Sequence, residues 1–263
     1  MSRFRLAVSS LLLLPASLAY AETTDEPADE SIAARAPANE DSFTPGLTHA
    51  SAAGRAITTA TATLDGAKHT NTVDLNGEIQ VFGPVRLVLR VDNVFAGSDG
   101  KARPGIGAAV QLLDERKHGV AGSAYISYKA EGFTEGEGEI EGLVSFGKQI
   151  GPVHGTLNLA YGQDPEAVER DGELALGLHV EPIHGLFTGV IGRFRDALGS
   201  NGDKGVLLNG GQIVRDALGG ASATYVIGNF GLTATAGIAG VKTTTSRTMQ
   251  AGPAAAFSVG TVF

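Results

Sequence analysis

The 263-residue sequence contains no cysteine and no tryptophan. Without cysteine the chain has no disulfide framework, no cysteine-ligated zinc, no cysteine nucleophile and no amino-terminal lipid anchor. Charged residues make up only 18% and the formal net charge is -8, so we expect no basic surface for nucleic acid. Glycine is abundant instead, with 37 residues, which favours a chain with many tight turns.

Residues 1–21 have the pattern of a cleavable export signal. Arg3 and Arg5 form a positive start, Leu6 to Leu18 form an apolar stretch broken by Pro15, and Ala19-Tyr20-Ala21 is a small-x-small cleavage site. The alternative is a membrane-anchoring helix, but the apolar stretch is shorter than the about 20 residues that a span needs. We therefore expect the protein to be exported.

Residues 22–54 differ in composition from the rest of the chain. The stretch ETTDEPADESIAARAPANEDSFTPG is acidic, rich in Ala, Pro and Ser, and poor in large apolar residues. Such a segment buries too little surface to offset the entropy lost on ordering. We predict a disordered segment here, with a plug inside a β-barrel as the alternative.

Residues 55–263 are predicted to be a run of strands. Apolar residues alternate with small or polar ones over segments of about ten residues, and Gly, Pro, Asn and Asp separate the segments. These twelve segments are 56–65, 72–83, 85–96, 105–113, 119–130, 137–148, 153–162, 173–182, 185–196, 220–228, 230–241 and 252–263.

The connections between these segments alternate in length. Tight turns occur at 82–84, 147–152, 182–185 and 228–229, and longer polar loops at 97–104, 131–136, 163–172, 198–219 and 242–251. Short turns at one end and long loops at the other are typical of a transmembrane β-barrel. The predicted fold is therefore all-β, an antiparallel transmembrane barrel of about 12 strands.

The alternation also assigns the two faces of each strand. Leu174, Leu176 and Leu178 share one face, for example, while Glu173 and His179 share the other. In a membrane barrel the apolar face meets lipid and the polar face lines the lumen. The residues predicted to face the lumen are Glu78, Arg86, Arg90, Asp92, Lys129, Glu137, Glu139, Glu141, Glu173, His179, Arg193 and Arg195.

The final segment, GPAAAFSVGTVF, places Phe257, Val259 and Phe263 on one face and ends the sequence. On these residues the chain resembles bacterial outer-membrane β-barrel proteins, whose last strand typically ends in Phe. The resemblance implies that Phe263 is part of the assembly signal read by the barrel-assembly machinery. It also implies the cell outer membrane as location, with membrane lipid and lipopolysaccharide as partners. It identifies no substrate and no oligomeric state.

Aromatic residues near strand ends are expected to form thin membrane-interface girdles. They are Phe82, Phe95, Tyr128, Phe146, Tyr161, Phe187, Phe194, Tyr225, Phe230 and Phe263.

Three functions remain open at this stage. The charged lumen predicts a passive or weakly selective channel for small solutes, or a closed structural or surface-interaction barrel filled by salt bridges. A soluble secreted β-protein uses the same alternation, with the apolar face as its core. No H-E-x-x-H, G-x-S-x-G, Walker or dinucleotide motif is present, so we expect no enzyme, no catalytic residues and no cofactor.

Candidate metal ligands are scattered. Glu137, Glu139 and Glu141 lie about 7 Å apart along one strand face, and basic partners or a cation would relieve their repulsion. Loop carboxylates are alternative Ca²⁺ or Mg²⁺ ligands, although a solvated acidic rim is the favoured interpretation: Glu135, Asp164, Glu166, Glu169 and Asp171. His118, His154 and His184 fall near predicted short turns, but we predict no metal site.

Overall fold

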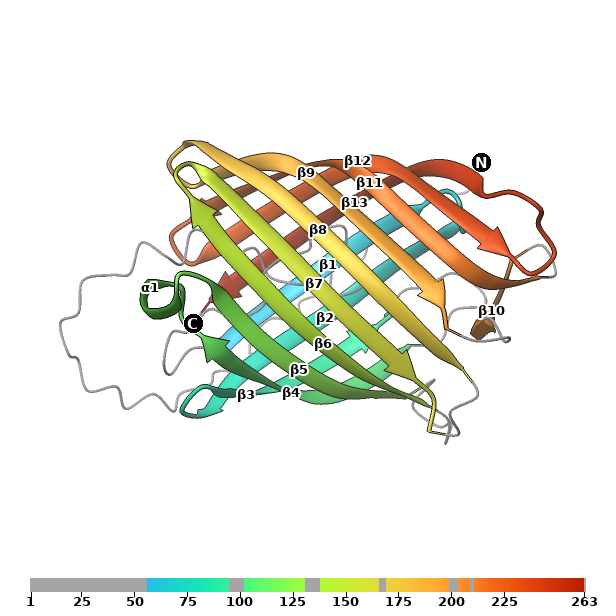
Figure 1. The fold of residues 1–263 in the computed structure, drawn as a ribbon, viewed down its shortest axis with the longest axis horizontal. Coiled ribbons are helices and arrows are strands. Elements are labelled where there is room, and N and C mark those ends of the chain that lie inside the picture. The colour runs from blue at the N-terminus through green and yellow to red at the C-terminus, as the bar shows by residue number, and fades with distance from the viewer. Residues whose placement is uncertain are drawn as a thin grey trace, which may run out of the picture.

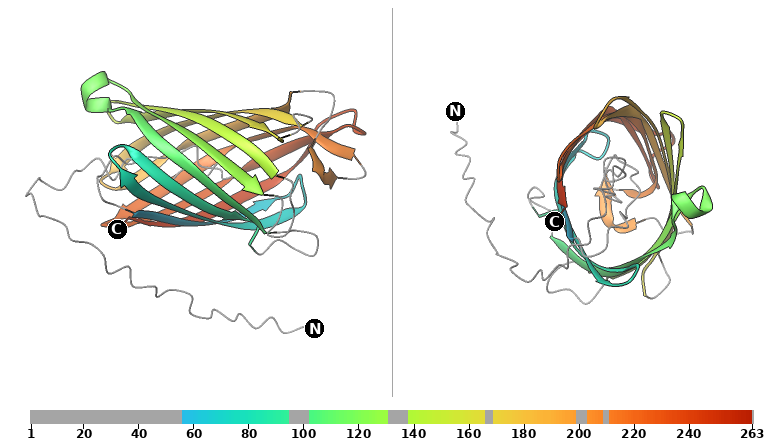
Figure 2. Two further views of the ribbon diagram at one scale, coloured as in Figure 1. Left: turned by 90° about the horizontal axis from the view of Figure 1, so that it is seen from below. Right: turned by 90° about the vertical axis from the view of Figure 1, so that its left-hand side faces the viewer.

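The computed structural model describes residues 56–94, 102–130, 138–165, 169–198, 203–208 and 211–262. These residues form a closed antiparallel β-barrel of 12 strands, which confirms the predicted fold class (Figures 1 and 2). The predicted signal peptide, the 22–54 segment, Glu137 and the terminal Phe263 lie outside the described residues. No helix among the described residues is both long enough and apolar enough to cross a membrane.

The strands follow one another around the wall. In the first half they are β1 (Ala56–Asp65), β2 (Thr70–Phe82), β3 (Val85–Asp92), β4 (Arg103–Leu113), β5 (Ala121–Ala130) and β6 (Gly138–Ile150). In the second half they are β7 (Val153–Gln163), β8 (Arg170–Ile183), β9 (Leu186–Ala197), β11 (Gly211–Ile227), β12 (Phe230–Thr243) and β13 (Gln250–Val262). A single helical turn, α1 (Glu115–His118), connects β4 to β5.

The ring closes between the first and last strands. β1 pairs with β13 from Ile57↔Val262 to Asp65↔Ala254, and β9 pairs with β11 over Leu186–Asp196. The extra short strand β10 (Asp203–Leu208) is therefore not one of the 12 strands of the ring, and it pairs only with the start of β11. Viewed along the barrel axis, β10 lies within the outline of the wall at one end (Figures 1 and 2).

One prediction about the strands was wrong. Residues 198–219 were expected to form one long loop before a strand at 220–228, but β11 begins at Gly211 and β10 occupies part of the loop. The sequence Val206-Leu207-Leu208-Asn209-Gly210-Gly211 carries an Asn-Gly hairpin signal, which favours a turn between two strands here rather than one long loop.

The tight turns lie together at one end of the barrel. They follow β2, β6, β8 and β11, and each contains a glycine with positive φ: Gly83, Gly151, Gly185 and Gly228. The connections after β3, β5, β7, β9 and β12 lie at the other end, which we call the long-loop end. The β1–β2 turn lies there too.

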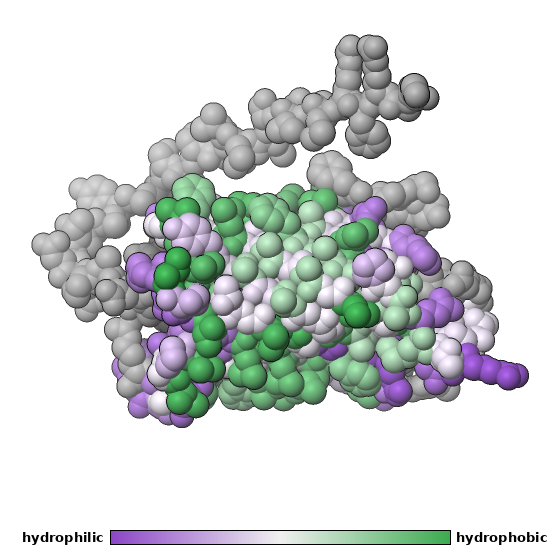
Figure 3. All heavy atoms as spheres, turned by 90° about the horizontal axis from the view of Figure 1, so that it is seen from above, coloured by the Kyte–Doolittle hydropathy of each residue, from purple (hydrophilic) through white to green (hydrophobic). Residues whose placement is uncertain are grey.

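The barrel is inverted relative to a soluble β-protein. Large apolar side chains such as Leu176, Ile126 and Ile238 are 50–65% exposed on the outer face, while charged residues such as Arg86 and Glu78 are about 5% exposed. Figure 3 shows the outer surface as a hydrophobic band with hydrophilic residues toward both ends. A soluble sandwich would bury the apolar face, so this arrangement excludes the soluble alternative for the described barrel.

Most of the expected girdle residues in the described ranges lie on this outer face, but Phe187 does not, and Phe95 and Phe263 lie outside those ranges. Phe82, Tyr161 and Phe230 are exposed, whereas Phe187 is only 6% exposed. Its odd position on β9 puts it with Ile191 and Arg193 on the inward side. A place near the end of a strand therefore does not by itself put an aromatic side chain on the outer face.

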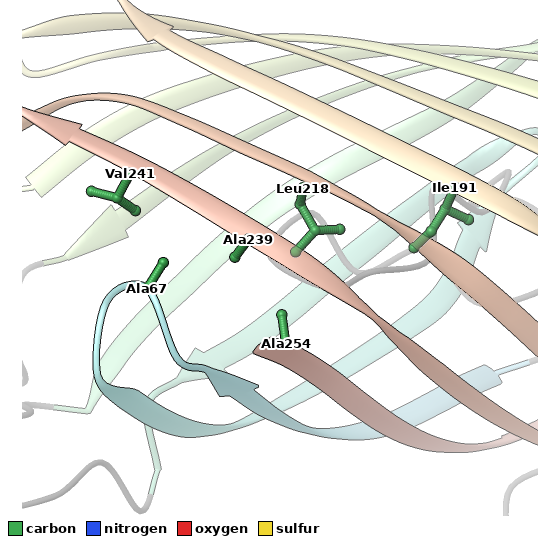
Figure 4. Close-up of a cluster of buried hydrophobic side chains, with 6 residues drawn as sticks. All are labelled: Ala67, Ile191, Leu218, Ala239, Val241 and Ala254. Carbon is green, nitrogen blue, oxygen red and sulfur yellow. The ribbon is translucent and has the colours of Figure 1, made fainter. Parts of the chain in front are cut away.

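The interior contains small apolar clusters rather than one continuous core. Ala67, Ile191, Leu218, Ala239, Val241 and Ala254 form the one drawn in Figure 4. Ala67 belongs to the β1–β2 turn, so this turn folds inward over the lumen at the long-loop end. Asp65 holds the turn because its Oδ1 accepts hydrogen bonds from the backbone amides of Ala67 and Lys68, both at 3.0 Å.

Candidate functional site

An ion-pair network spans the inner face of the wall from β3 to β6. Arg90 Nη2 lies 2.6 Å from Asp92 Oδ2 on its own strand, and Arg90 Nη1 lies 3.0 Å from Glu141 Oε2 on β6. Two strands, β4 and β5, separate these partners in the wall, so the guanidinium reaches its second carboxylate through the interior. Beside this bridge, Lys129 Nζ lies 3.4 Å from Glu139 Oε2, directly opposite it in the β5–β6 register.

Inward-facing glycines make room for these long side chains. A Cβ at Gly105 of β4 would lie 2.7 Å from Arg90 Cγ, so the missing side chain lets Arg90 lean across β4. A Cβ at Gly162 of β7 would lie 2.0 Å from Glu139 Oε1 in the same way. The charged cluster therefore depends on small neighbours as much as on its own residues.

A second network centres on Asp216 of β11. Lys68 Nζ, from the inward-folded β1–β2 turn, lies 2.8 Å from Asp216 Oδ2, and Arg193 Nη2 of β9 lies 3.0 Å from Oδ1. Arg193 Nε also approaches Glu173 Oε2 of β8 at 3.9 Å. The Asp216 side chain is 4% exposed, so two cations fix one buried carboxylate and anchor the turn across the lumen.

Further pairs occupy the remaining wall. Arg195 of β9 contacts Asp171 of β8, and Arg86 Nη1 of β3 lies 3.3 Å from Glu78 Oε2 of β2. By contrast, β12, β13 and β1 present mainly uncharged hydroxyls inward, apart from Asp65 at the end of β1. Thr61 Oγ1 of β1 donates a hydrogen bond of 3.0 Å to Ser258 Oγ of β13. The lumen thus has a charged side and a hydroxyl-lined side.

A small cavity of about 70 Å³, open to solvent, lies at the long-loop end. Its wall includes basic and acidic residues contributed by β4, β5, β6, β8, β9 and β11, among them Arg103, Lys129, Glu139, Asp171, Arg195 and Asp216. We call this cavity the vestibule. Charges of both signs around an open cavity suit polar solutes rather than apolar ones.

The sequence-predicted lumen residues fall as follows. The side chains of Glu78, Arg86, Arg90, Asp92 and Lys129 are buried. Those of Glu139, Glu141, Glu173, His179, Arg193 and Arg195 are partly buried on the inward positions of their strands, and Glu137 lies outside the described residues. Both networks and the vestibule are built from these residues and their partners.

Sequence reasoning missed Lys68 and Asp216. Lys68 lies in a turn, where alternation assigns no face, and Asp216 lay in the stretch predicted to be a loop. Strand alternation read backward from Leu218 and Gly220 along β11 gives the inward position of Asp216, once the hairpin before β11 is recognised.

The loop carboxylates do not form a metal cluster in the described part of the chain. Asp164, Glu169 and Asp171 line the vestibule, but within the described ranges no three His, Asp or Glu side chains are close enough to hold one ion. Glu135 and Glu166 lie outside those ranges. Basic residues, in particular Lys129 and Arg195, lie among the carboxylates instead.

Comparison with known proteins gives a likeness of fold. No protein-family model and no curated protein sequence matches the chain. Among solved structures, the NanC porin superimposes with a TM-score of 0.53 at 6% identity, covering 78% of this chain and 98% of that one. LpxR from Salmonella typhimurium gives 0.47 at 10% identity, covering 79% of this chain and 100% of that one. An anion-selective porin from Comamonas acidovorans gives 0.38 at 7%, covering 80% and 98%. The chain therefore has the fold of outer-membrane β-barrels.

Proposed function

We propose that the protein is an outer-membrane channel that passes small hydrophilic solutes and prefers cations. The observation that carries the proposal is the solvent-open vestibule, whose charged lining of both signs is continued along the inner wall by the ion pairs of β3, β5, β6, β8 and β9. An exposed apolar belt with this polar interior suits a bilayer, in which lipid meets the belt and water enters the lumen.

The preference for cations follows from the balance of inward charge. The inward acids are Asp65, Asp74, Glu78, Asp92, Glu139, Glu141, Asp171, Glu173, Glu181 and Asp216. The inward bases in the described residues are fewer: Lys68, Arg86, Arg90, Arg103, Lys129, Arg193 and Arg195. A low-dielectric wall focuses this net negative charge and raises the local concentration of cations.

We place the constriction of the proposed channel at the Arg90–Glu141 bridge. The bridge links strands that are not neighbours by leaning over the inner face of β4 and β5, and its side chains are 6% and 12% exposed. In this proposal solutes pass beside the bridge, along the side formed by β12, β13 and β1. A narrow and weakly selective pore is therefore expected rather than a wide one.

The test is conductance of the refolded chain in planar lipid bilayers. The wild-type protein is expected to show small single-channel current steps. In a KCl gradient its reversal potential should shift toward the equilibrium potential of K⁺. Replacing Arg90 and Glu141 together by Ala leaves the net charge unchanged and should raise the single-channel conductance. The matched control is Glu115→Ala with Lys117→Ala, two oppositely charged residues of α1, which lies outside the wall and away from the vestibule and should leave conductance unchanged.

A closed structural barrel is the second candidate, favoured by the low exposure of inward side chains. Ser145, Thr61 and Val241 are at most 1% exposed, as expected for a filled interior. Folded barrels that conduct neither as wild type nor as the Arg90/Glu141 double variant would overturn the channel and favour this candidate. Anion preference in an active wild type would overturn the charge argument alone.

A further inference from the structure

Two histidines face each other across neighbouring strands inside the barrel. His154 of β7 and His179 of β8 are direct partners in the antiparallel register, near the end with the tight turns. Both lie on the inward positions of their strands. Directly opposed residues on one face have Cβ atoms about 4.5–5.5 Å apart, which is close enough for both imidazoles to reach one ion.

The contacts that the two rings make with other residues point both rings in the same direction around the wall, from β7 toward β11. The His154 ring meets Phe187 of β9 edge-on, with centroids 5.2 Å apart at 85°. The His179 ring reaches over β9 to β11, where its Nε2 lies 2.6 Å from Ser222 Oγ. It passes Gly189, its own register partner, where a side chain would collide with β8. The two rings therefore stay side by side.

Each imidazole has a nitrogen available for a ligand. His154 Nε2 is buried and has no hydrogen-bond partner among the described residues. Nε2 of His179 is hydrogen-bonded to the Ser222 hydroxyl. In the tautomer in which Nε2–H donates to Ser222, the free lone pair of the ring lies on Nδ1. Metal-binding histidines are commonly oriented in this way by a hydrogen bond to their other nitrogen.

We infer that His154 and His179 form a binding site for one divalent transition-metal ion, Ni²⁺, Cu²⁺ or Zn²⁺. Neutral imidazole suits these ions, which bind nitrogen at about 2.0–2.1 Å in the case of zinc. No third histidine or carboxylate joins the pair among the described residues, so water completes the coordination shell. The site is thus a two-histidine site of exchangeable metal, distinct from the charged networks near the long-loop end.

The site differs from the grouping that the sequence suggested. His118 and His184 were placed with His154 because all three lie near short turns, yet both are exposed, and His184 lies 3.5 Å from Glu181. Strand register, and not position near a turn, selects the pair. His118 and His184 therefore serve as internal controls.

The test is calorimetric titration of the folded full chain in detergent with NiCl₂, together with electron paramagnetic resonance of the Cu²⁺ form. Wild type should bind one equivalent, and the Cu²⁺ spectrum should show nitrogen ligation. His154→Gln and His179→Gln should each abolish this binding, while His118→Gln and His184→Gln should retain it. Ser222→Ala should weaken binding by about tenfold, as losing an orienting partner does.

Barrel folding of each variant is checked by heat-modifiable gel migration, so that loss of the metal is separated from loss of structure. Folded wild type that binds no metal would overturn the site, and so would binding that survives His154→Gln and His179→Gln. Binding is measured without conductance, so failure of the channel proposal leaves this result unaffected.

Discussion

At the scale of single residues, buried charges in this protein are held by more than one partner. Asp216 meets both Lys68 and Arg193, and Arg90 meets both Asp92 and Glu141. A buried charge is costly unless it is paired, and removing one partner leaves the others uncompensated. Asp216 therefore matters more than its single carboxylate suggests.

Asp216→Ala should lower the free energy of unfolding by about 3–5 kcal/mol, because Lys68 and Arg193 lose the buried carboxylate with which they pair. Urea titration of the refolded barrel, followed by circular dichroism, measures the change. Asp196→Ala is the control, since its partner Arg215 is 41% exposed and exposed pairs contribute little. Equal losses for the two variants would contradict the role assigned to the Asp216 network.

At the scale of the element, each strand carries two different environments one residue apart. In β6, Leu143 and Ser145 are buried at 4% and 0%, while Val144 between them is 38% exposed on the outer face. The alternation was readable in the sequence because side chains in a strand point to opposite faces with a period of two. What lies beyond each face depends on the surroundings of the barrel.

Val144→Lys should impair insertion, because a lysine on the lipid face costs about 2–4 kcal/mol at the midplane and about 0–1 near the interface. Val144 lies in the middle of β6, whereas Ile140 lies near its start and is 46% exposed. Ile140→Lys should therefore cost less. The folded fraction after refolding into lipid vesicles measures both, and a greater loss for Ile140→Lys would invert the predicted membrane depth.

At the scale of the whole molecule, the barrel exists only if its first and last strands meet. β1 and β13 come from opposite ends of the described chain, and Thr61 and Ser258 are register partners joined by their hydroxyls. Closure removes every free edge of the 12-strand ring, which an open sheet would expose. The seam therefore determines whether the rest of the wall can form.

Thr61→Pro should prevent closure, since proline donates no ladder hydrogen bond and is not tolerated inside a paired strand. Loss of the fast-migrating form on unheated gels is the expected result. Thr61→Val keeps the backbone ladder and removes one hydroxyl contact, which should cost about 1 kcal/mol and leave closure intact. A Thr61→Pro variant that still migrates as a closed barrel would show that the seam is dispensable.

The sequence predicted the strand segments, the alternation of their faces and the two classes of connection well. It also indicated basic partners for Glu137, Glu139 and Glu141, and Lys129 lies opposite Glu139 in the β5–β6 register. It failed at Asp216 and Lys68, where a missed hairpin and an inward-folded turn concealed the inward positions. Alternation assigns a face only where the strand itself is recognised.

The sequence by itself determined the all-β class and the alternation of apolar and polar faces, since alternation and turn chemistry are local properties of the chain. Only the tertiary structure decided that the apolar face points outward and which charges meet. Arg90 reaches Glu141 across two intervening strands, and His154 faces His179 rather than His118 or His184. These contacts depend on ring closure, strand register and the glycines that leave room for long side chains, and none of these is fixed by any one segment.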